Sequence, residues 1–112
     1  MSKPIKINFS VGGTPVVNYD GTSDFTTDTQ EVCFNHVWSF QVEDNTTGGN
    51  PNYTIEVSND GSTWTSYFNN AENIPLDESY EDNRLAFLYM RIVYNATGVS
   101  SGTVTFNLVL KR

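Results

Sequence analysis

The sequence predicts an all-β fold, a two-sheet antiparallel β-sandwich with jelly-roll-like connectivity and seven to eight strands. Apolar and polar residues alternate in five segments, as they do in strands with one buried face. No segment keeps the 3.6-residue apolar spacing of a helix over three turns. Aromatic and β-branched residues are plentiful, whereas good helix formers are scarce.

The length of 112 residues fits one domain, so we expect residues 1–112 to form a single sandwich. Cys33 is the only cysteine, which excludes an internal disulfide and is consistent with a reducing compartment. The segment from Met1 to Lys6 has no signal-peptide core, and no apolar run approaches the length of a membrane span. We therefore expect folding in a cytoplasm.

The N-terminal part predicts two strands. Apolar residues alternate with polar ones from Ile5 to Val11, until a pair of glycines ends the pattern. Pro15–Val17 follows as a candidate edge strand, because proline cannot donate to a central ladder. Residues 18–28 are polar and rich in turn formers, with Phe25 as an isolated apolar anchor.

The longest predicted strand runs from Glu31 to Glu43. Its apolar stripe comprises Val32, Phe34, His36, Trp38, Phe40 and Val42. Such alternation suits a sheet with one core face and one solvated face. Residues 44–52 have almost nothing to bury and are predicted to form a mobile surface loop.

Residues 53–65 predict a β-hairpin, because alternating residues precede the turn sequence Asn59-Asp60-Gly61. A loop over residues 58–61 would place Trp64 opposite Ile55 on the buried face. A loop one residue shorter would turn the indole to the other face, so burial of Trp64 favours the longer loop.

Two further strands are predicted, from Leu85 to Tyr94 and from Thr103 to Leu110. Their inward residues are Leu88, Met90, Ile92 and Tyr94 in the first and Val104, Phe106, Leu108 and Leu110 in the second. A long acidic connection over residues 69–83 precedes them.

Three motifs in the C-terminal half resemble those of known proteins. They are V-S-N-D-G-S-T-W at residues 57–64, Y-M-R-I-V at residues 89–93 and G-T-V-T at residues 102–105. Together they resemble small β-sandwich structural proteins of tailed-phage particles, and the hairpin is also similar to that of discoidin-like sandwich domains. The resemblance implies a structural protein of a virus particle.

The net charge of −7 argues against binding nucleic acid through phosphates. Residues 7–83 contain no Lys or Arg, and all 13 acidic residues lie between Asp20 and Asp82. We interpret the acids as a solvated surface that aids solubility. The alternative is a bipolar molecule whose two faces contact different neighbours.

No residue pattern predicts catalysis or metal binding. His36 lacks a second histidine or a carboxylate motif, and no motif supplies a base for Cys33, so both are interpreted as structural residues. Acids between Glu72 and Asp82 offer hard oxygen ligands, but their spacing matches no EF-hand loop. We expect no enzymatic activity, no cofactor and no metal. The glycosylation sequons at Asn45, Asn52 and Asn95 carry little weight without a signal peptide.

These features predict a non-enzymatic virion structural protein of a bacteriophage, a capsid decoration or minor head protein. It is expected in the virion after synthesis in the host cytoplasm, as a homo-oligomer or bound to the major capsid protein, without nucleic-acid or membrane partners. Because both terminal strands look ordered and basic, the predicted assembly interface is Lys3, Ile5, Lys6, Lys111 and Arg112.

The alternative function is a carbohydrate-binding, lectin-like module. Aromatic side chains that face outward can stack on sugar rings, and Tyr67 and Tyr80 are the residues predicted to form such a platform. If these rings instead fill the core or an interface, the platform is absent.

Overall fold

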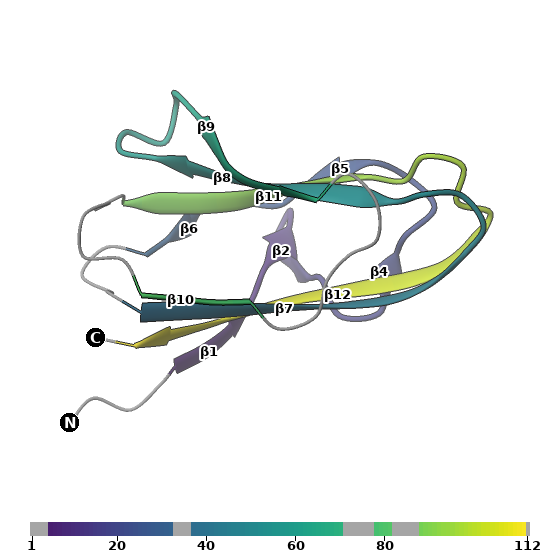
Figure 1. Cartoon of the computed structure of the whole chain (residues 1–112), viewed down its shortest axis with the longest axis horizontal. Coiled ribbons are helices and arrows are strands. Elements are labelled where there is room, and N and C mark those ends of the chain that lie inside the picture. The colour runs from purple at the N-terminus through teal and green to yellow at the C-terminus, as the bar shows by residue number, and fades with distance from the viewer. Residues whose placement is uncertain (1–4, 33–36, 71–77, 82–87, 112) are drawn as a thin grey trace.

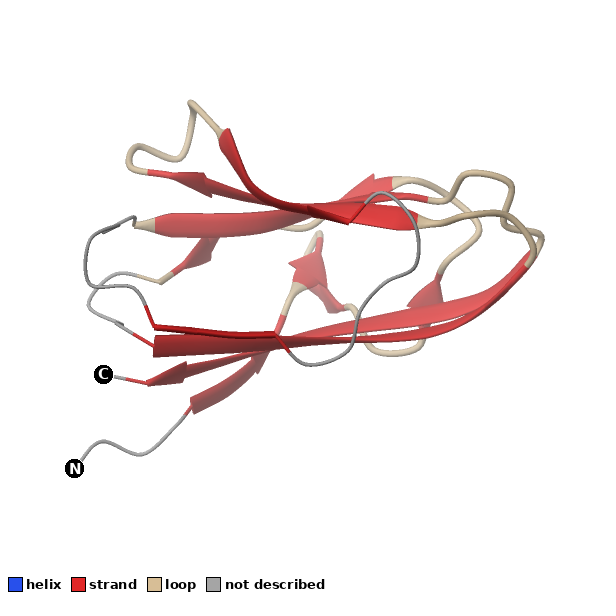
Figure 2. Ribbon diagram, in the orientation of Figure 1, coloured by secondary structure: helices blue, strands red, loops and turns tan. Residues whose placement is uncertain are grey.

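The computed structural model describes residues 5–32, 37–70, 78–81 and 88–111, and none of these residues lies in a helix. Their strands form two facing five-stranded sheets and a separate two-stranded ribbon (Figures 1 and 2). All strand pairs are antiparallel. The predicted all-β antiparallel fold is confirmed.

Each sheet is built from segments far apart in the sequence. The first sheet contains β1 (Ile5–Asn8), β4 (Tyr19–Asp20), β7 (Val37–Thr47), β10 (Glu78–Glu81) and β12 (Ser101–Lys111). The second sheet contains β5 (Phe25–Thr26), β6 (Gln30–Glu31), β8 (Asn52–Ser58), β9 (Thr65–Asn70) and β11 (Tyr89–Asn95). The ribbon pairs β2 (Ser10–Val11) with β3 (Thr14–Pro15).

The connectivity is that of a jelly roll. β1 and β4 pair with different stretches of β12 on the side opposite β7, so they share one strand position. β5 and β6 likewise share the position beside β11 that lies opposite β8. The described chain then has eight strand positions, ordered 1-8-3-6 in the first sheet and 2-7-4-5 in the second. This count agrees with the seven to eight strands predicted.

The core fills the space between the two sheets. Its fully buried strand residues are Val42, Val104, Phe106 and Leu108 from the first sheet and Tyr53, Ile55, Met90, Ile92 and Tyr94 from the second. The Phe25 ring centroid lies 4.9 Å from that of Tyr94 and 5.8 Å from that of Phe106. Phe25 is therefore not the isolated anchor that the sequence suggested but part of an aromatic cluster between the sheets.

The strand predicted from Glu31 to Glu43 is divided in the structure, so this prediction was wrong. Residues 30 and 31 pair with β11 in the second sheet, whereas β7 begins at Val37 in the first. Alternation cannot reveal this change of sheet, because both parts have the same period. Residues 44–47, predicted to be loop, continue β7 and pair with β12.

The hairpin is confirmed, but the predicted loop and the predicted position of Trp64 are wrong. β8 ends at Ser58 and β9 begins at Thr65, so the connection is longer than the predicted four residues. Ile55 pairs with Phe68, and an irregularity after Ile55 shifts the register, as a β-bulge does. Trp64 precedes β9 and is half-buried.

Two smaller expectations also differ from the structure. The edge strand expected at Pro15–Val17 is found at Thr14–Pro15 in the ribbon, and Val17 is 45% exposed. Leu88, expected to point inward, is 43% exposed because β11 begins only at Tyr89.

At one end of the sandwich the turn after β7 contacts the turn before β12. Two backbone hydrogen bonds of 2.9 Å join these turns. Gly49 has φ 66°, and a Cβ there would lie 2.2 Å from the Thr97 carbonyl oxygen. Gly102 has φ 114°, and a Cβ there would lie 2.2 Å from the Asn45 carbonyl oxygen. Both positions require glycine for conformation and for space.

We predict that Gly102→Ala lowers the free energy of unfolding by more than about 3 kcal/mol, because strain and a backbone clash act together. Gly13→Ala is the matched control, since Gly13 has φ 84° but nothing within 4 Å of an added Cβ. The control should cost only about 1–2 kcal/mol, the strain of the left-handed conformation. Urea denaturation measures both, and equal losses would contradict the close approach at residue 102.

Candidate functional site

β1 forms one edge of the first sheet, because within the described residues it pairs only with β12. Ile7 packs partly against the core, whereas Lys6 is exposed. β1 is therefore anchored on one side by its ladder to β12. On its other side it presents backbone groups and a cation, which is the kind of edge that pairs with another chain.

The structure places part of the predicted assembly interface at this edge. Ile5 lies opposite Leu110, so the backbones of Ile5 and Lys111 belong to the paired ends of β1 and β12. Lys3 and Arg112 lie outside the described residues. The described start and end of the chain thus meet at one edge of the first sheet.

The opposite edge of the first sheet is β10, which pairs with β7 and with no other described strand. Glu78 lies opposite Phe40, and Glu81 lies opposite Val37. These glutamates belong to the acidic stretch weighed as a cation site, whose other acids lie outside the described residues.

The other described acids line the surface. Asp20, Asp24, Asp28, Glu31, Glu43, Asp44 and Asp60 are exposed, while Glu56 is half-buried. In the described ranges, no three His, Cys, Asp or Glu residues are grouped so that they could hold a metal ion. His36 and Cys33 lie outside these ranges.

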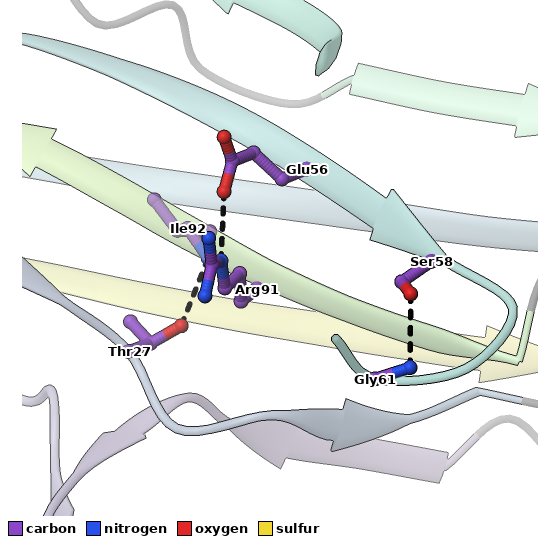
Figure 3. Close-up of polar contacts among 6 residues, drawn as sticks. All are labelled: Thr27, Glu56, Ser58, Gly61, Arg91 and Ile92. Atoms are coloured by element: carbon purple, nitrogen blue, oxygen red, sulfur yellow. Dashed lines mark hydrogen bonds and ion pairs between the residues drawn. The ribbon is translucent and has the colours of Figure 1, made fainter. Parts of the chain in front are cut away.

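Arg91 organises the outer face of the second sheet, a role that the sequence reading missed. It lies directly opposite Glu56, and its Nε donates to Glu56 Oε1 at 2.7 Å (Figure 3). Its guanidinium carbon lies 4.2 Å from the centroid of the Trp64 ring. The indole is therefore stacked under a cation on the surface rather than packed opposite Ile55.

The structure places several of the aromatic rings that could stack on a sugar. Tyr67 is half-buried and packs against the core, Tyr53 and Tyr94 are fully buried, and Trp64 lies under Arg91. The side chain of Tyr80 lies outside the described part of the chain.

Tyr94 is a structural tyrosine. Its hydroxyl donates to the Gly21 carbonyl at 2.9 Å. Burial raises the pKa of Tyr94 to about 12, and the negative charges of Asp44, Asp24 and Asp20 add to the rise. The hydroxyl thus stays protonated at neutral pH and remains a donor.

Ser58 and Asp60 shape the hairpin turn. The Ser58 hydroxyl accepts from the Gly61 amide at 2.9 Å (Figure 3). Asp60 Oδ1 accepts from the amides of Thr63 and Ser62, each at 2.8 Å, and from the Ser58 hydroxyl at 2.9 Å. These bonds lower the pKa of Asp60 from 3.8 to about 2, and the bond from the Thr63 amide has the largest effect.

Asp28 plays a comparable part at the ribbon. Its carboxylate accepts from the amides of Gly13 and Gly12 at 2.8 and 2.9 Å and from the Ser10 hydroxyl at 3.0 Å. These donors, the Gly13 amide above all, hold the pKa of Asp28 below its usual range. The neighbouring Thr27 hydroxyl accepts from the Ile92 amide at 2.8 Å (Figure 3). This segment therefore fastens the ribbon to the second sheet.

The described residues form strands and loops, and a helix that could span a membrane is not found among them.

Comparison with known proteins shows a similar fold in a solved structure. No family model and no curated protein matches the sequence. The crystal structure of SPBc2 prophage-derived protein YomS is similar, with a TM-score of 0.59 and 8% sequence identity. The match covers 99% of this chain and 97% of that chain. At this identity the similarity shows a shared fold over nearly the whole of both chains.

We predict that the Asp60 carboxylate makes stability fall in acid. Because the folded-state pKa is depressed, its contribution is complete above the ordinary value of 3.8 and is lost as the pH falls toward about 2. Urea denaturation between these pH values should show a weaker pH dependence in Asp60→Asn, which keeps an acceptor but does not titrate. Ser62→Ala, which keeps the amide donor, should behave as wild type. An unchanged slope in Asp60→Asn would refute this role.

We predict that Trp64→Ala lowers the free energy of unfolding by about 1–2 kcal/mol, because the indole is half-buried and stacks on the guanidinium group of Arg91. Ile55→Ala should cost about 2–5 kcal/mol, since that side chain is fully buried. Denaturant melts compare the two variants. If the two variants lose the same free energy of unfolding, Trp64 is packed as deeply as Ile55 and the stacking on Arg91 is wrong.

Proposed function

We propose that this chain is a non-enzymatic structural protein of a bacteriophage particle, specifically a capsid decoration or minor head protein. It works without a cofactor. It is made in the host cytoplasm and then binds copies of itself or the major capsid protein in the virion, with no nucleic-acid or membrane partner.

The observation that carries the proposal is the fold similarity to a prophage-derived protein over 99% of this chain and 97% of that one. Two chains of nearly equal extent share the whole jelly roll rather than a fragment of it. Jelly rolls also recur in viral capsid proteins, which makes this architecture suited to shell surfaces. The step from fold to role is an analogy, so the site must support it.

The described polar residues give that support through structural roles. Asp28 and Asp60 accept backbone amides at turns, Tyr94 donates to a backbone carbonyl, and Arg91 pairs with Glu56. Within the described residues, β1 and β10 are the edges of the first sheet and could pair with another chain. A subunit that works by contact needs such surfaces and needs no reactive group.

We predict that immunogold labelling with an antibody to this chain decorates the heads of particles purified from its source phage. The same antibody should detect the chain when those particles are dissolved. A chain that is abundant in the lysate but absent from purified particles would overturn the proposal. If the label is found only on tails, the chain is still a structural protein of the particle but is not a head protein.

Deleting Met1 to Lys6 should reduce incorporation into particles while the isolated domain keeps its cooperative melt, because Phe9 and later core residues remain. Glu43→Lys is the matched control, since Glu43 is exposed on the central strand β7 and not at an edge. Normal incorporation of the truncated chain would contradict an interface at β1.

A further inference from the structure

The two edges of the first sheet carry opposite charge. Across the sheet the order is β1, β12, β7, β10, so β1 and β10 lie farthest apart. Within its described residues, β1 contains Lys6 and no acid. β10 contains Glu78 and Glu81 and no cation. These strands therefore carry a cation at one edge of the sheet and two acids at the other.

The strand directions of these edges are also compatible. β1 runs antiparallel to β12, β12 to β7, and β7 to β10. It follows that β1 and β10 run antiparallel to each other. A second copy placed beside the first in the same orientation would bring its β10 alongside β1 as an antiparallel neighbour, the arrangement already used by every described strand pair.

We propose that the partner of β1 is β10 of a second copy of this chain, so that copies join head to tail and extend the first sheet. This inference rests on the proposed structural function and names its partner. Main-chain hydrogen bonds between the edges would supply contact, and the opposite charges would set partner and register.

Charge also decides against two-fold pairing of like edges. Joining β1 to β1 would bring Lys6 near Lys6 of the second copy, and joining β10 to β10 would bring glutamates near glutamates. Like charges directly opposite in a sheet are destabilising. A head-to-tail contact avoids both conflicts, and repeated contacts of this type close into rings or continue as filaments.

The test uses charge reversals at the edges and sedimentation velocity of the full chain at low salt. Lys6→Glu and Glu81→Lys should each weaken self-association about tenfold or more, because each places like charges at the contact. An equimolar mixture of the two variants should associate again, since each unlike pair then has opposite charges. The control Glu43→Lys changes net charge as Glu81→Lys does and should associate as wild type. Thermal melts confirm that each variant is folded.

Each contrary result is specific. If Lys6→Glu weakens association and Glu81→Lys does not, copies pair through β1 alone and the head-to-tail contact is wrong. If the control is weakened equally, net charge and not the edges governs association. If the wild-type chain stays monomeric at high concentration, the inference fails. In all three cases the immunogold experiment still decides independently whether the chain belongs to a particle.

Discussion

The ladder between β7 and β12 is the constraint on which the rest of the fold depends. All eleven residues of β7 pair with all eleven of β12, from Ser101 opposite Thr47 to Lys111 opposite Val37. β12 also holds β1 and β4 on its other side and contributes Val104, Phe106 and Leu108 to the core. Because β1, β4 and β7 all pair with β12, most of the first sheet depends on contacts between residues far apart in the sequence, and such contacts slow folding.

The alternation of residues made the class and most strands predictable. Tyr53, Ile55, Met90, Ile92 and Tyr94 are buried as their spacing indicates. What the period could not supply was the sheet to which a strand belongs, since the division between β6 and β7 leaves the alternation unchanged. It also could not set the length of the connection between β8 and β9, which places Trp64 before β9 and away from Ile55.

The candidate site was only partly visible in the sequence for a related reason. The separation of Lys6 from Glu78 and Glu81 can be read from the sequence, but their placement on opposite edges depends on the order of strands. Arg91 could have been found, because it alternates with Met90 and Ile92 and therefore faces away from the core. Its pairing with Glu56 depends on register, which links β11 to β8 across 35 residues of sequence.

β1 is held in place by the rest of the fold. β1 is held by four residue pairs to β12, and beyond Asn8 the chain continues into Phe9, which is buried and bonded to Phe106. The inner side of β1 is thus fixed before any partner arrives, so a neighbour that adds to its outer side need not order it first. A pre-formed edge favours binding by main-chain pairing, where the contact itself carries little sequence preference. Discrimination between correct and incorrect neighbours must then come from side chains along the edges. In an acidic chain, Lys6 is the cation that β1 has for this purpose.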